Sequence, residues 1–319
     1  MNRYASIFTF LFGTTGNILN TLVFSQRSFR SNPCAICFLF SSVANLIAIL
    51  FGVTSRMLNG WSADLTNTDR FICKFRTFIL NVARPVAFWL ILLAAIDRWL
   101  LSSANARYRQ ISTMKNAIRS MIIILISSIV LFSHIIYCYE PNMIDEPLQC
   151  YGKNITCRLV SAILFAFVTT FFPVLLMLIF GLMTINNLRQ SKNHIQPGDI
   201  SHRRNQESNK GNQRQRFNKI NNHLLVMLFG QIVLLFMLGL PLGIEKLYEA
   251  ITMDRPTTKV QIAIDKFVYN IVLLLNFLAN GSPFYIYTLA GGKEFRKAFF
   301  KLLSAIGQKI YDAKRMFHL

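Results

Sequence analysis

Three of the charged residues in a long apolar stretch, Cys73–Leu101, are the side chains best placed for chemistry. Arg84 lies near its middle, and Asp97-Arg98 lies near its end. A charge among apolar groups costs several kcal/mol unless it faces water or a partner. Arg84 is therefore expected to bind a partner of opposite charge or line a binding site. Asp97 and Arg98 are expected to interact at a boundary with water.

No group of residues has catalytic or metal-binding spacing. The five histidines are scattered through the chain, at His134, His194, His202, His223 and His318. Metal sites usually draw on closely spaced ligands, and the sequence also has no glycine-rich phosphate loop and no nucleophile motif. We predict that the protein is not an enzyme and has no cofactor and no metal site.

Composition indicates which elements hold these residues. Of the 319 residues, 53% are apolar and 15% are charged, and the mean hydropathy is +0.40. A soluble domain has about 25% charged residues, so an ordinary soluble enzyme, a disordered chain and a disulfide scaffold are excluded. About 20 apolar residues span a bilayer as a helix. The predicted fold is an all-α membrane protein, a seven-transmembrane-helix bundle, from these apolar runs: Ala5–Ser25, Ala35–Leu58, Cys73–Leu101, Ala117–Tyr139, Leu159–Met183, Leu224–Ile244 and Val268–Leu289.

The distribution of basic residues predicts the orientation of the bundle. With the N-terminus outside, 22 of the 34 Lys and Arg residues fall in cytoplasmic segments and 11 in outer segments. Positive charge gathers on the cytoplasmic side of membrane proteins. The net charge of +20 is thus explained by contact with anionic lipid or a cytoplasmic partner. Nucleic acid is not an expected partner.

Two regions are predicted along the chain. Residues 1–291 form the transmembrane domain, in which residues 190–216, rich in Asn, Gln, Ser, Lys and Arg, form a mobile third cytoplasmic loop. Residues 292–319 form a cytoplasmic amphipathic helix and tail. In Lys293–Leu303, apolar residues alternate with basic ones at helical spacing, which is typical of a helix on the membrane surface.

The third run carries the most specific signal. Cys73 opens it on the outer side, and Asp97-Arg98-Trp99 closes it on the inner side, with Arg98 25 residues after Cys73. This arrangement resembles the rhodopsin-like (class A) family of G-protein-coupled receptors, in which Trp99 replaces a tyrosine. Further positions similar to the family pattern are the pair Gly16-Asn17, the helix-kinking prolines Pro173 and Pro241, and Pro283 in the segment Ser282–Tyr287.

The resemblance implies two structural features of the outer side. The family's disulfide would join Cys73 to Cys150, with Cys138 and Cys157 as alternative partners of Cys73 or as a second bridge. Asn154 begins an Asn-Ile-Thr sequence and is the predicted glycosylation site. Cys34 is expected to be a free thiol at the cytoplasmic end of the second run, as is Cys37.

The resemblance also assigns a switch. Asp97, Arg98 and Trp99 would form the G-protein switch, in which agonist binding moves the sixth helix outward and releases Arg98 to contact the G protein. An ordinary boundary arginine that anchors the helix is the alternative. The inner end of the sixth run offers Asn221 and Asn222 instead of an acid, so a weak resting lock and high basal activity are expected.

Four charged residues are predicted to bind the ligand. Arg84 lies about four turns above Arg98, in the outer half of the membrane. Glu245, Lys246 and Glu249 lie at the outer end of the sixth run. The alternative is that Arg84 and Glu245 pair with each other.

Several family positions differ here. Asn45 replaces an aspartate, Gly181 replaces a tyrosine, and Pro241 lacks the usual Cys-Trp before it. These differences are typical of a divergent member. In character it is closest to invertebrate peptide receptors of the FMRFamide type or to chemosensory receptors.

The predicted protein is a plasma-membrane, multi-pass receptor. It binds an extracellular ligand, with a small peptide of neuropeptide signalling favoured, and activates a heterotrimeric G protein. A seven-helix transporter or channel subunit is one alternative, because Arg84 suits an anion pathway. A receptor-like protein that has lost signalling is the other.

Overall fold

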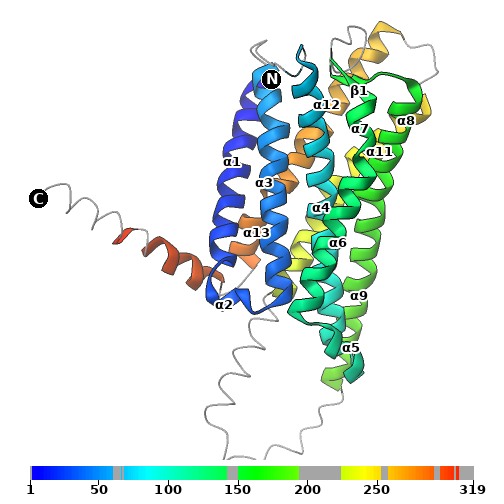
Figure 1. Cartoon of the computed structure of the whole chain (residues 1–319). Helices are drawn as coiled ribbons and strands as arrows, with labels where there is room; N and C mark the ends of the chain where they lie inside the picture. The colour runs from blue at the N-terminus through cyan, green and yellow to red at the C-terminus, as the bar shows by residue number, and fades with distance from the viewer. Residues whose placement is uncertain are drawn as a thin grey trace, which may run out of the picture.

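The structure is a computed structural model that describes residues 2–59, 66, 68–141, 150–193, 224–252, 258–290, 295–304 and 307–308. Within these residues, seven helical spans are long and apolar enough to cross a membrane. The spans run side by side as a bundle, with the N-terminus at one end (Figure 1). The prediction of a seven-helix bundle is confirmed.

Three of the seven spans, the fourth, fifth and sixth, are not single uninterrupted α-helices. The first three are α1 (Asn2–Phe24), α3 (Pro33–Asn59) and α4 (Arg70–Ser102). The later ones are α6 (Met114–Phe132) with α7 (His134–Cys138); α8 (Ile155–Leu164) with the π-helix η2 (Phe165–Phe171) and α9 (Phe172–Asn193); the sixth span (Leu224–Thr252), which contains the π-helix η3 (Leu235–Gly239) and α11 (Leu240–Thr252); and α12 (Lys259–Gly281).

Short elements connect the spans. Helices α2 (Arg27–Arg30) and α5 (Ala106–Ile111) lie at the end of the bundle opposite the N-terminus (Figure 1). At the N-terminal end, β1 (Tyr139–Glu140) pairs antiparallel with β2 (Tyr151–Gly152). This hairpin was not predicted, because two residues a strand are too few to give a pattern in the sequence.

The seventh span differs most from its predicted bounds. It begins at Lys259, where the Thr258 hydroxyl accepts a hydrogen bond from the Gln261 N–H at 3.2 Å, and not at Val268. It ends at Gly281, and the short helix α13 (Pro283–Ala290) follows. Hydropathy detects only the apolar part of a helix, which lies in the lipid. The polar first turns of α12 were therefore not predicted. The break follows from Pro283, which has no N–H to donate to an earlier carbonyl.

A π-helical segment precedes each of the two predicted helix-kink prolines in the fifth and sixth spans. Pro173 is the second residue of α9 and follows η2, and Pro241 is the second residue of α11 and follows η3. Such segments leave backbone carbonyls without their usual α-helical donor. One of them, the carbonyl of Val168, accepts a hydrogen bond from Trp89 Nε1 at 2.9 Å. The irregular turn therefore ties the fifth span to α4.

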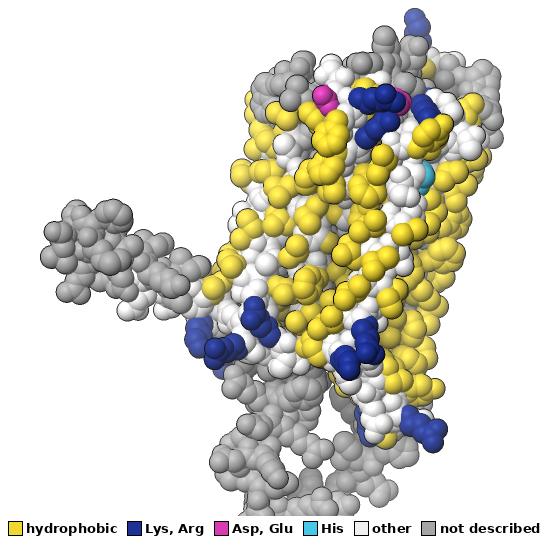
Figure 2. Space-filling model, in the orientation of Figure 1, with side chains coloured by type: hydrophobic (Ala, Val, Ile, Leu, Met, Phe, Trp, Pro, Cys, Tyr) yellow, Lys and Arg dark blue, Asp and Glu magenta, His cyan; other side chains and the backbone are white. Residues whose placement is uncertain are grey.

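The outer surface of the bundle is apolar over its middle. Figure 2 shows a yellow belt of hydrophobic side chains between two ends where Lys and Arg gather. On α6, Ile123 is 63% exposed and Ile126 is 55% exposed. A continuous exposed apolar belt marks a surface that another apolar phase covers. This surface is suited to lipid.

Close helix contact inside the bundle depends on glycine. A Cβ atom on Gly281 of α12 would lie 2.7 Å from the Cα atom of Gly13 in α1. Beside this contact, Asn17 Nδ2 donates to the carbonyl of Asn280 at 3.1 Å. The predicted pair Gly16-Asn17 therefore lies where the first and seventh spans meet.

The C-terminal segment packs on the inner end of the bundle. A helix over residues 295–304 buries Phe295 against the rings of Phe24 and Tyr287. Gln26 Nε2 donates to the carbonyl of Ala298 at 2.9 Å. The rest of the predicted tail, except residues 307–308, lies outside the described residues. The same is true of the predicted loop 190–216 beyond Asn193, where α9 ends.

Candidate functional site

The inner end of α4 holds a buried ion pair. Arg98 Nη2 lies 2.7 Å from Asp97 Oδ2, and only 2% of Arg98 is exposed. Arg98 Nη2 also donates to Asn32 Oδ1 at 2.8 Å. Consecutive residues on a helix do not normally face each other, so this pair forms because the long arginine side chain turns toward the carboxylate beside it. The charge is neutralised inside the protein, as a buried arginine requires.

The second carboxylate oxygen of Asp97 is engaged by the loop after α5. Ser112 donates a short hydrogen bond to Asp97 Oδ1. Asn32 lies just before α3, where its Oδ1 also accepts from the Cys34 N–H at 3.1 Å. The ion pair therefore joins three parts of the inner surface. We call Asn32, Asp97, Arg98 and Ser112 the inner polar cluster.

Trp99 points away from this cluster. Its ring lies against Phe180 of α9, with centroids 5.3 Å apart, and against Tyr108 of α5, with centroids 5.6 Å apart. Trp99 thus packs α4 against the fifth span and the following loop. Its contacts are aromatic, while those of its two neighbours are electrostatic.

At the outer end, two disulfides tie down the segment between the fourth and fifth spans. Cys73 at the start of α4 is bonded to Cys150, with Cα atoms 5.7 Å apart, and Cys138 is bonded to Cys157. Cys34 and Cys37 are free and buried. The hairpin β1–β2 lies between the two bridges, which hold it beside the outer end of α4, and we call this hairpin the outer covering.

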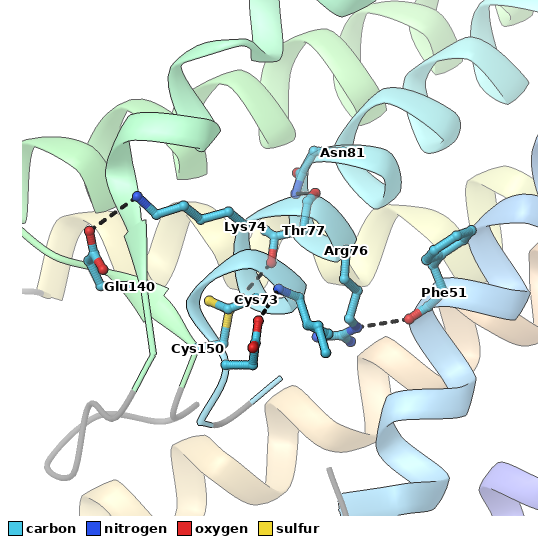
Figure 3. Close-up of a disulfide and its surroundings, with 10 residues drawn as sticks. Phe51, Cys73, Lys74, Arg76, Thr77, Asn81, Glu140 and Cys150 are labelled. Atoms are coloured by element: carbon cyan, nitrogen blue, oxygen red, sulfur yellow. Dashed lines mark hydrogen bonds and ion pairs between the residues drawn. A yellow bond between two sulfur atoms is a disulfide. The ribbon is translucent and has the colours of Figure 1, made fainter. Parts of the chain in front are cut away.

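Ion pairs reinforce this covering. Glu140 of β1 lies 2.8 Å from Arg70 and 3.2 Å from Lys74. Figure 3 shows Lys74 reaching toward Glu140, while Arg76 reaches the other way to the backbone carbonyl of Phe51, 2.8 Å from its Nε. The hydrogen bond from Arg70 is the main cause that lowers the pKa of Glu140, and Lys74 adds to it.

Arg84 lies deeper, between aromatic rings. Its guanidinium carbon is 4.6 Å from the ring centroid of Phe277 in α12 and 5.7 Å from that of Phe165 in η2. Only 7% of the residue is exposed. No ion pair joins it to Glu245 among the described residues, so the alternative that these two pair with each other is wrong.

The other predicted ligand-binding residues lie at the outer end of α11. Lys246 forms an ion pair with Glu249 and lies over the Tyr269 ring, 4.7 Å from its centroid. Glu245 is partly buried, and its Oε2 has no hydrogen-bond partner within the described residues. The structure therefore brings Lys246 and Glu249 together but leaves Arg84 and Glu245 apart.

Comparison with known proteins matches this arrangement to one family. Residues 16–302 match the family described as 7 transmembrane receptor (rhodopsin family). The chain belongs to this family. A search of curated proteins finds no match. The protein is therefore a multi-pass membrane receptor of a family whose members bind an extracellular ligand and act on a G protein, and are not enzymes.

Two residues of the receptor's inner polar cluster were not predicted. Ser112 lies 15 residues after Asp97 and Asn32 lies 66 residues before Arg98. Asn32-Pro33 does carry a recognisable signal, because Asn is favoured just before a helix and Pro at its first position. That signal predicts a helix start and says nothing of Arg98. For Ser112 there is no comparable signal.

Proposed function

We propose that the receptor lies in the plasma membrane and binds a small extracellular peptide between the outer halves of its helices. It then activates a heterotrimeric G protein through the inner ends of α4, α9 and the sixth span. Asp97, Arg98 and Trp99 are the switch residues. Arg84, Glu245, Lys246 and Glu249 contact the ligand.

The inner polar cluster carries this proposal. Its hydrogen bonds come from the loop before α3, from α4 and from the loop after α5, so a shift of any of these elements breaks at least one bond. Such an arrangement has two discrete states, one with Arg98 bonded inside the bundle and one with Arg98 released. A ligand that favours the second state shifts the population toward it.

The outer side supports an extracellular ligand of peptide size. Two disulfides hold the covering segment in place, and charged side chains of both signs lie below it on α4 and α11. Asn154 is exposed at the start of α8, as a glycosylation acceptor must be. The departures at Asn45 and Gly181 support a divergent member of the family, of the peptide or chemosensory type.

The direct test is Asp97→Asn, read as basal nucleotide exchange on a panel of purified G proteins. The substitution removes the negative charge that holds Arg98, so basal exchange should rise several-fold. Asp69→Asn is the matched control on the same helix. Asp69 accepts a hydrogen bond from the Ile72 N–H at 2.7 Å, and Asn is equally good at that position.

Equal exchange by wild type and Asp97→Asn would remove the switch role. Absence of exchange with every G protein, in both proteins, would indicate a receptor that does not signal. Currents carried by anions in cells that express the protein would instead favour the channel alternative.

A further inference from the structure

Arg84 is a buried cation with hydrogen-bonding capacity that the described protein leaves unused. Its Nε and Nη2 atoms are both buried and have no hydrogen-bond partner in the described part of the chain. Burying an unpaired charge is costly, and the contacts that the described residues make with this guanidinium group are with ring faces. An arginine that is buried without a hydrogen-bond partner is suited to bind an anionic group of another molecule.

The charges around Arg84 do not neutralise it. Among the described residues, Tyr269 and the two cations Arg56 and Arg76 lie near enough to act on it electrostatically. Arg56 Nη1 donates to Asn270 Oδ1 at 2.6 Å, and Arg76 Nε donates to a backbone carbonyl. Neither of these neighbours supplies the negative charge that Arg84 lacks.

The described carboxylates at the outer end of the bundle that could neutralise Arg84 do not pair with it. Glu249 is paired with Lys246, and Glu140 is paired with Arg70 and Lys74. Glu245 makes no ion pair with Arg84, and the charges that act on it are those of Lys246 and Asp265. Within the described residues no carboxylate neutralises Arg84, so the site is open to a negative charge from another molecule.

The positions of Nε and Nη2 on the Arg84 guanidinium group indicate which kind of anion it would bind. Nε and Nη2 lie on one edge of the guanidinium plane, and a carboxylate bridges that edge with two parallel hydrogen bonds. The rings of Phe277 and Phe165 approach the same guanidinium group and restrict the space around it. A flat group with two coplanar oxygens fits this setting better than a tetrahedral phosphate or sulfate.

We propose that Arg84 binds a carboxylate of the receptor's ligand by its Nε–Nη2 edge. The ligand is then an acidic peptide or a peptide with a free C-terminal carboxylate, and not a neutral amidated one. This rests on the proposed function for the source of the ligand, but the carboxylate site itself is testable without signalling.

The first test measures the thermal stability of the purified receptor in detergent, without ligand. Arg84→Met removes a buried unpaired charge and keeps an apolar side chain of similar length, so the Tm should rise by roughly 2–4 °C. Arg76→Met, the matched control, removes a hydrogen-bonded arginine from the same helix and should lower the Tm. A fall in Tm for Arg84→Met, or its failure to fold, would show a structural role and overturn the proposal.

The second test adds small anions to the wild-type receptor, with formate and acetate compared with chloride and phosphate at equal ionic strength. The carboxylates should raise the Tm of the wild type, by mass action on the folded state, and leave Arg84→Gln unchanged. Equal stabilisation of both proteins, or stabilisation by phosphate alone, would contradict a carboxylate site. Arg70→Gln, which removes an exposed arginine of α4, should respond as the wild type does.

The third test uses paired peptide libraries, one with free C-terminal carboxylates and one amidated and free of Asp and Glu, read by calcium and cyclic nucleotide. Activity should be confined to the acidic library, and Arg84→Gln should raise the EC50 of active peptides roughly 10- to 100-fold. Activity of the amidated library, unchanged in Arg84→Gln, would overturn the carboxylate site while supporting a peptide receptor. Stabilisation by formate with no response to any peptide would support the site and contradict the peptide ligand.

Discussion

Arg84 and Arg98 lie on the same helix, 14 residues or about 21 Å apart along its axis, and both are almost fully buried. Arg98 has a carboxylate and an amide oxygen within 3 Å. Arg84 has two aromatic rings and, among the residues that the structure describes, no bonded oxygen at its Nε or Nη2. Burial alone therefore does not define the role of an arginine in this receptor. The partners differ, and this difference is the basis for proposing that Arg98 holds a conformation and that Arg84 binds a ligand.

The largest expected effect separates the two arginines by the sign of a stability change. Arg98→Met leaves the Asp97 carboxylate buried without its cation, which should destabilise the receptor by about 3–5 kcal/mol. Arg84→Met should be stabilising instead. The check is thermal denaturation of both variants in the same detergent, with Arg76→Met as a third arginine of α4. If both arginines lowered the Tm equally when replaced, the contrast between them would be lost.

A smaller effect is expected for the amide that joins α3 to Arg98. Asn32→Ala removes both the helix cap and the hydrogen bond to Arg98, so it should cost about 1–2 kcal/mol and raise basal nucleotide exchange less than Asp97→Asn does.

Asn32→Ser separates the two roles of Asn32. Serine also caps helices well, but its shorter side chain does not extend as far toward Arg98. Stability should then be mostly kept while basal exchange still rises. Exchange at the wild-type level in both variants would show that Asn32 serves the helix start alone.

The smallest effect belongs to the outer covering, where Glu140 is paired but accessible to water. The pKa of Glu140 is lowered in the folded receptor, so its pairing stabilises the fold above the ordinary glutamate pKa of 4.5. This contribution is lost as the pH falls through the lower, folded value.

The measurement compares the Tm of wild type and Glu140→Gln between pH 7 and pH 3. The wild type should be more stable by less than about 1 kcal/mol at pH 7, and the difference should vanish in acid. A difference that persists at low pH would assign the effect to packing and not to charge.

The seven spans, their orientation and the family could be predicted from the sequence, because each depends on local patterns. About 20 apolar residues require a helix in lipid wherever the rest of the chain goes. Cys73 and Asp97-Arg98 are similarly informative because their spacing lies within one helix. The same locality explains the errors, since the polar start of α12 at Lys259 and the hairpin at Tyr139 leave no apolar signal.

The amino-acid pattern is therefore enough to predict which segments enter the membrane and which charged residues enter with them. The groups that those charges contact are known only from the folded bundle. Asn32 lies 66 residues from Arg98, and Phe277 lies far along the chain from Arg84, yet each pair is in contact. Such contacts depend on how seven helices pack together, which the hydropathy of any one of them does not specify. For that reason Arg98 could be recognised from its sequence neighbours, while the unpaired state of Arg84 could not.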